Sequence, residues 1–262
     1  MAKKDYWKRN LAWLLLAVSI CVMATSGYEL WKIHNMYAQG DQKYQELLQA
    51  VKAPAALEAT PSWEPLNPDM PDTAFDFETL QQINSDAVAW LYGPGTVIDY
   101  PVMRADDYNQ YLRHLPDGTY NANGSLFLDY NNPSDFSGRL NIIYGHNMKS
   151  EKMFGTLEQY KKQAYYEAHP YLYLYTVWGD YRVELLYGCV IGAGQWRDRA
   201  FMYESNREGL LDYGAYHTTF DSKASYSEED RIIVLSTCSY DFDDARYIVI
   251  GVLRPQDEAT SR

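Results

Sequence analysis

Residues 231–253 read RIIVLSTCSYDFDDARYIVIGVL, two apolar runs rich in β-branched residues and joined by a short polar loop. β-Branched residues favour strands, and Ser and Asp favour the turn between them, so the stretch predicts a hairpin. Cys238 stands where the first strand ends, and Arg246 stands where the second begins. Pairing of the two strands would bring the guanidinium near the thiol.

The same pattern, short apolar runs separated by Gly, Asn, Asp and Pro, extends back to about residue 75. Strands are expected at Val97–Val102, Ser125–Leu128, Leu140–Tyr144, Leu172–Thr176, Tyr181–Ile191, Arg231–Ser236 and Tyr247–Leu253. Helices are expected at Phe77–Ile83, Met153–Glu167 and Arg207–Phe220. Seven or eight strands with a few helices predict a mostly β fold, a closed or nearly closed β-barrel.

The N-terminal segment predicts a membrane anchor. Residues 11–28 begin LAWLLLAVSICVMA and carry no charge, which meets the lower length limit for a spanning helix. Four basic residues precede this run, so the positive-inside rule makes residues 1–10 a cytoplasmic tail and places the bulk of the chain outside. A signal peptide cleaved near Ala24-Thr25-Ser26 is the alternative to an uncleaved transmembrane anchor.

The remaining chain divides by composition. Residues 29–52 have helical spacing of apolar residues, and five prolines follow between 53 and 74, so residues 29–74 are expected to form a helical stalk and an extended linker. A catalytic domain is expected over residues 75–255 and a short tail over 256–262.

Composition excludes several classes of function. A net charge of -12 disfavours a nucleic-acid partner, and three cysteines are too few for a disulfide scaffold of this length. The chain lacks the motifs of P-loop nucleotide binding, zinc proteases and serine hydrolases. These three classes of function therefore lack support in the sequence, which shows no motif for a metal site or an organic cofactor.

His146 ends the apolar run NIIYGHNM in the way that Cys238 ends its own. A thiolate accepts an acyl group and releases it again, a nearby histidine moves the proton, and an arginine stabilises the oxyanion, so the three residue types together suit acyl transfer. A lone strand cysteine is more often an inert core residue, and a lone histidine is more often structural.

The segments NIIYGHNM, LSTCSY and ARYIVIGVL together resemble the sortases, although Val234 replaces the first Thr of the family's T-L-x-T-C pattern. YLRH, GSLFLDYNN and a helical insert near residues 204–226 are similar to class B, sortase B, in particular. The resemblance covers roughly residues 75–253. It implies that Cys238 is the nucleophile, His146 the general acid/base and Arg246 the oxyanion-stabilising group. Substrate-groove positions are expected at Thr237, Tyr240 and Asp241.

The resemblance further implies a surface enzyme of Gram-positive bacteria that cleaves a C-terminal sorting motif of secreted proteins after a Thr. The acyl chain would pass to an amine of the cell-wall peptide. The expected partners are secreted proteins with such a sorting signal, the cell-wall amine and, through residues 11–28, the lipid bilayer. A catalytically silent peptide-binding module and a cysteine peptidase that only hydrolyses are the alternatives.

Overall fold

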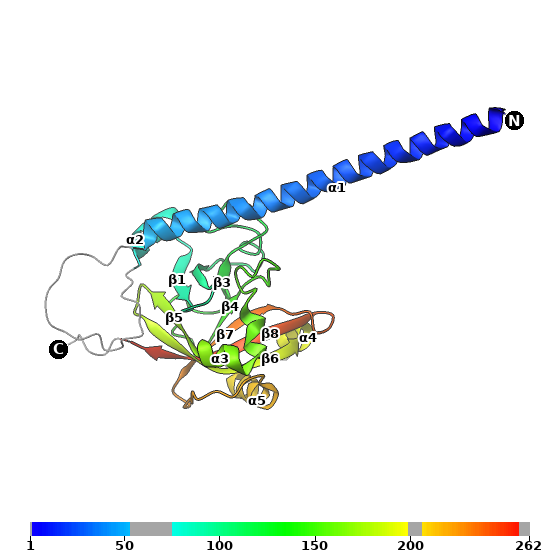
Figure 1. The fold of residues 1–262 in the computed structure, drawn as a ribbon. Helices are drawn as coiled ribbons and strands as arrows, with labels where there is room; N and C mark the ends of the chain where they lie inside the picture. The colour runs from blue at the N-terminus through cyan, green and yellow to red at the C-terminus, as the bar shows by residue number, and fades with distance from the viewer. Residues whose placement is uncertain (1, 53–74, 199–205, 257–262) are drawn as a thin grey trace. The chain divides into compact units, whose positions relative to one another are not determined.

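The computed structural model describes residues 2–52, 75–198 and 206–256, which divide into two compact units between Lys43 and Tyr44 (Figure 1). The Pro-rich segment and nearly all of the C-terminal tail expected from the sequence lie outside the described residues.

The first unit is built from one helix. α1 (Ala2–Val51) is continuous over 50 residues and passes through Gly40 without a break. Its portion Asn10–Val51 contains a stretch of mean hydropathy 1.8 that is not buried at all, and Leu14 is 62% exposed. Such length and apolarity make α1 a candidate membrane span.

The last turns of α1 belong to the second unit. Leu47 and Val51 are buried in an apolar cluster with Trp90, and the hydroxyl of Tyr44 donates to the carbonyl of Gly124 at 2.6 Å. The described chain resumes at Phe75, and the amide of Asp76 donates to the Val51 carbonyl at 2.8 Å. The compact unit therefore includes the C-terminal end of the helix that the sequence assigned to the stalk.

Eight strands form the barrel of the second unit. They are β1 (Ala87–Tyr92), β2 (Asp99–Met103), β3 (Leu126–Leu128), β4 (Leu140–Tyr144), β5 (Tyr171–Thr176), β6 (Tyr181–Gly192), β7 (Arg231–Cys238) and β8 (Ala245–Pro255). Their order around the closed barrel is β1-β2-β3-β4-β7-β8-β6-β5. Two neighbouring pairs, β2 with β3 and β4 with β7, are parallel, and the other pairs are antiparallel.

The predicted barrel is confirmed, with one strand that the sequence pattern did not reveal. β4 has the predicted bounds, and β7 runs two residues further than expected, so that Cys238 is still in the strand. β1 was not predicted, because nearly all of its residues are buried and its sequence AVAWLY shows no polar alternation.

Short helices join the strands. α2 (Phe77–Ile83) has the predicted bounds, and Asp76 caps its N-terminus by accepting a hydrogen bond from the amide of Thr79 on its carboxylate. The single helix expected over Met153–Glu167 is instead two shorter ones, η1 (Leu157–Lys161) and α3 (Gln163–Ala168). After β6 come α4 (Ala193–Asp198) and α5 (Arg207–His217), the latter lying in the predicted helical insert.

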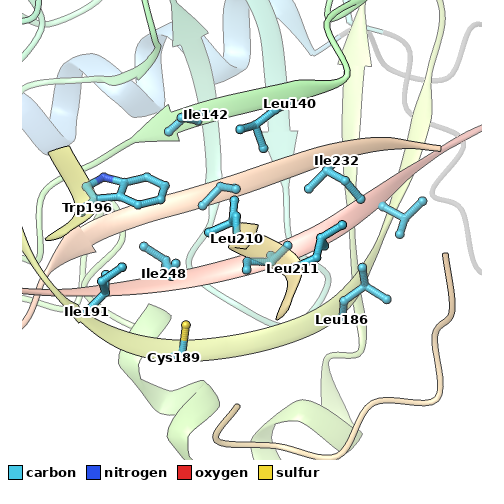
Figure 2. Packing of buried hydrophobic residues seen from close by; sticks show 13 residues of the cluster. Leu140, Ile142, Leu186, Cys189, Ile191, Trp196, Leu210, Leu211, Ile232 and Ile248 are labelled. Carbon is cyan, nitrogen blue, oxygen red and sulfur yellow. The ribbon is translucent and has the colours of Figure 1, made fainter. Parts of the chain in front are cut away.

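The helices α4 and α5 cover one face of the sheet. Alternate residues of β4, β7 and β8, among them Ile142, Val234 and Ile250, join a buried cluster with Trp196 of α4 and Leu210 of α5 (Figure 2). Side chains alternate along a strand. Cys238 therefore lies on the same face of β7 as Val234, and Arg246 lies on the same face of β8 as Ile250.

Candidate active site

Three strand ends bring the predicted catalytic residues together. β4 and β7 are parallel, with Tyr144 beside Ser236, and His146 and Cys238 each stand two residues further along the chain. β7 and β8 are antiparallel, and the residue directly opposite Cys238 is Arg246. Residues opposite each other in an antiparallel pair have their Cβ atoms about 5 Å apart on one face of the sheet. The hairpin expected from the sequence therefore sets Arg246 directly opposite Cys238.

The two cysteines of the barrel have opposite environments. Cys238 is exposed at the end of β7, whereas Cys189 is buried in the cluster under α5. Burial raises the pKa of the Cys189 thiol to about 12, which suppresses the thiolate form. Only Cys238, of these two, is placed to react with a substrate.

Hydrogen bonds hold the ends of β4 and β7 against each other. The hydroxyl of Thr237 donates to the Gly145 carbonyl at 2.8 Å, and the Gly145 amide donates to the Ser236 carbonyl at 3.1 Å. The side-chain amide of Asn147 donates to the Cys238 carbonyl at 2.8 Å. The backbone on both sides of the candidate nucleophile is thus fixed by the strand that carries His146.

The ring of His146 is oriented by a backbone carbonyl. Its Nε2 lies 2.7 Å from the carbonyl oxygen of Leu112, in the segment between β2 and β3. A carbonyl oxygen only accepts, so Nε2 carries the hydrogen and the neutral ring has its lone pair on Nδ1. Nδ1 is the atom through which His146 would exchange a proton.

Arg246 is half-buried at the start of β8. Its Nη1 donates to the Ala245 carbonyl at 2.9 Å, and the same carbonyl accepts the amide of Ser239 at 2.9 Å. A guanidinium has five N–H donors in a planar fork, so this bond orients the group and leaves other donors for a ligand.

The remaining expected groove positions differ from one another. Thr237 is 2% exposed and its hydroxyl bonds to the Gly145 carbonyl, while Tyr240 is 71% exposed on the loop after Cys238. Asp241 is exposed but forms an ion pair of 2.5 Å with Lys161. A direct contact of any of the three with substrate stays a prediction.

The structure adds four residues that the sequence patterns did not indicate. They are Leu112, Asn147, Glu158 and Lys161. Leu112 acts through its backbone carbonyl, and Glu158 and Lys161 contact Ser239 and Asp241, which lie about eighty positions away. No local spacing in the sequence indicates such contacts. Asn147 follows His146 directly in the segment NIIYGHNM, and this position is the only indication of its role that the sequence offers.

Comparisons with known proteins agree with the fold. The chain is 30% identical over 241 residues to sortase B of Listeria monocytogenes, covering 90% of this chain and 95% of that protein. It is 29% identical over 178 residues to sortase B of Staphylococcus aureus, covering 67% of this chain and 73% of that protein. A crystal structure of a Bacillus anthracis protein similar to sortase B has a TM-score of 0.68 at 26% identity, over 84% of this chain and 98% of that one. No model of a protein family matches.

A closed barrel with a cysteine, a histidine and an arginine at adjoining strand ends defines the class of cysteine transpeptidases that the sortases represent. Within that class the chain belongs to the sortase B family. The relatives support a sortase-type transpeptidase of the cell wall.

Proposed function

We propose that this chain acts as a membrane-anchored transpeptidase with Cys238 as nucleophile, His146 as general acid/base and Arg246 as the oxyanion-stabilising group. The observation that carries the proposal is the register of the strands, which sets Arg246 opposite Cys238 and ends the parallel strand of His146 at the same edge. The proposed substrate is a secreted protein with a C-terminal sorting motif, cleaved after a Thr.

The reaction has two acyl-transfer steps. His146 takes the proton of the Cys238 thiol on Nδ1, and the thiolate attacks the carbonyl carbon of the scissile amide. The C–N bond breaks and a thioester forms while the protonated His146 gives that proton to the leaving amine and becomes neutral again. An amine of the cell-wall peptide then attacks the thioester and loses a proton to His146. The new amide forms as the C–S bond breaks, which restores the thiolate.

The structure supports distinct roles for the histidine and the arginine. The bond from Nε2 of His146 to Leu112 leaves Nδ1 for proton transfer in both steps. Arg246 remains cationic at neutral pH and offers planar donors where the tetrahedral intermediate carries negative charge. Neither role needs a metal or an organic cofactor.

The proposed anchor is the N-terminal part of α1. Residues 11–28 would span the bilayer, with residues 1–10 in the cytoplasm and the barrel on the outside of the cell. The apolar, unburied stretch within Asn10–Val51 and the basic residues before it support this orientation.

The test is transfer to an added amine. The purified chain is incubated with a library of sorting-motif peptides and with candidate cell-wall amines, and the products are identified by mass. We expect a product in which the N-terminal peptide fragment is joined to the amine. A product that carries water in place of the amine would make the chain a hydrolase, and intact peptide in every reaction would favour a silent binding module.

A further inference from the structure

A cluster of polar side chains surrounds the loop that joins Cys238 to Arg246. We call it the Lys161 cluster, and its members come from the loop after β4, from η1 and from the loop after β7. They are Asn147, Glu158, Lys161, Ser239 and Asp241. None of these side chains is needed for the two acyl-transfer steps described above.

Lys161 is the centre of the cluster. Its ammonium lies 2.5 Å from Oε1 of Glu158 and 2.5 Å from Oδ2 of Asp241, so one cation joins η1 to the loop after β7. The ammonium also lies 5.3 Å from the ring centroid of Tyr247, the residue after Arg246. The hydroxyl of Ser239, which is itself buried, lies within hydrogen-bond distance of both carboxylates.

Asn147 connects the cluster to the backbone of the nucleophile. Its Nδ2 lies 2.8 Å from Oε2 of Glu158 and 2.8 Å from the carbonyl oxygen of Cys238. An amide nitrogen has two hydrogens, so both bonds form at once. The carboxylate of Glu158 therefore holds Asn147 in the orientation that fixes the Cys238 carbonyl.

The charges of the cluster support one another. A hydrogen bond from Lys161 lowers the pKa of Asp241. Burial opposes ionisation of Glu158, but hydrogen bonds from Lys161 and Asn147 lower its pKa. The single hydrogen of the Ser239 hydroxyl adds to this effect at one of the two carboxylates at a time. Burial disfavours the charged ammonium, but the bonds to Asp241 and Glu158 raise the pKa of Lys161 above its usual value. All three groups are thus ionised at neutral pH.

From these contacts we infer that Lys161 is a positioning residue for the proposed reaction. Through Glu158 and Asn147 it fixes the backbone of Cys238, and through Asp241 it fixes the loop that leads to Arg246. The thiol and the guanidinium are consequently held in the relative geometry that acyl transfer requires. This inference rests on the proposed function of Cys238 and Arg246.

The main test compares Lys161→Met with Lys162→Met in the full chain. Lys162 is exposed, and its ammonium donates to Oε1 of Gln159 at 2.9 Å and not to a carboxylate of the Lys161 cluster. Its loss therefore controls for the removal of a lysine from this segment. We expect Lys161→Met to lower kcat for peptide cleavage about 10- to 100-fold with KM changed less than about threefold, as a misplaced reacting group does. Lys161→Arg should recover most of kcat, and Lys162→Met should match the wild type.

A second variant keeps the test decisive if Lys161→Met fails to fold. Asp241→Asn preserves shape and removes one charge, and it should lower kcat at unchanged KM and leave the thermal midpoint within a few degrees. In the double variant Lys161→Met/Asp241→Asn the loss should be less than the product of the two single losses, because both remove one ion pair. If the wild type is active, an unchanged kcat in folded Lys161→Met or in Asp241→Asn would overturn this inference and leave the proposed function standing. An inactive wild type would instead overturn the proposed function.

Discussion

Cys189 and Cys238 belong to two strands of one barrel, on either side of β8, and their thiols have different surroundings. Cys189 is enclosed by apolar side chains of β6 and α5, and Cys238 stands at the exposed end of β7. The sequence already predicts this difference, because Cys189 stands in the middle of its apolar run LLYGCVIG and Cys238 stands at the end of its own. The burial of Cys189 beside α5 confirms its interpretation as a small buried hydrophobic residue.

We expect this difference to appear in thiol labelling. With a pKa of about 12, Cys189 is thiolate in roughly one molecule in ten thousand at pH 8 and is also shielded from reagent. Treatment of the folded full chain with iodoacetamide at pH 8, followed by peptide mapping, should modify Cys238 and spare Cys189. Addition of denaturant should make both reactive. Labelling of Cys189 at the rate of Cys238 in the folded chain would contradict the burial.

Arg246 is distinguished from an ordinary surface arginine by its position opposite Cys238. Removal of one oxyanion donor typically lowers the rate about 10²- to 10³-fold, and an interaction made mainly in the transition state lowers kcat and kcat/KM together. Arg246→Ala should therefore fold, react with a small thiol reagent and lose most peptide turnover. Arg246→Lys should recover little, because an ammonium lacks the planar fork.

Steady-state kinetics of both variants on a cleavable peptide test this role. Turnover of Arg246→Ala close to that of the wild type would remove Arg246 from the reaction and leave a pair of cysteine and histidine.

Among the elements, the parallel pair of β4 and β7 determines the site. Its strands were predictable because their apolar runs are bounded by polar residues, and the strand-end positions of His146 and Cys238 followed from the same runs. β1 was not predictable from its pattern, since a strand buried at nearly every position has no polar alternation. The Lys161 cluster was beyond sequence reasoning because Lys161 and Asp241 meet only after the barrel closes.

The C-terminal end of α1 contributes to the packing of the barrel unit. Leu47 is 8% exposed in the apolar cluster around Trp90, whereas Leu30 is 69% exposed. Truncation of a buried leucine leaves a cavity, so Leu47→Ala should lower the free energy of unfolding by about 2–3 kcal/mol. Leu30→Ala should change it by less than about 0.5 kcal/mol.

Denaturant unfolding of the detergent-solubilised chain, followed by the fluorescence of the barrel tryptophans, measures both variants. Equal stability of the two would mean that the end of α1 does not support the domain, and the compact unit would then begin near Phe75.

At the scale of the whole molecule, the proposed anchor predicts the side of the membrane on which the barrel lies. The positive flank before an uncharged, unburied helical stretch should retain the N-terminus inside. Protease added to intact cells should therefore remove the barrel and leave a membrane-bound N-terminal fragment. Full protection of the chain in intact cells, with digestion after lysis, would contradict this orientation.

The central claim is that a sorting-motif peptide becomes a thioester of Cys238. The direct measurement mixes the full chain with a cleavable peptide in the absence of added amine, quenches with acid within the first turnover, and locates the adduct by intact mass and peptide mapping. We expect a mass increase equal to the N-terminal peptide fragment, on the peptide that contains Cys238, and its loss when an amine is added before the quench. Cys238→Ala should show neither adduct nor cleavage, while Cys189→Ala should show both. Cleavage that persists in folded Cys238→Ala, or an adduct on another residue, would contradict the account.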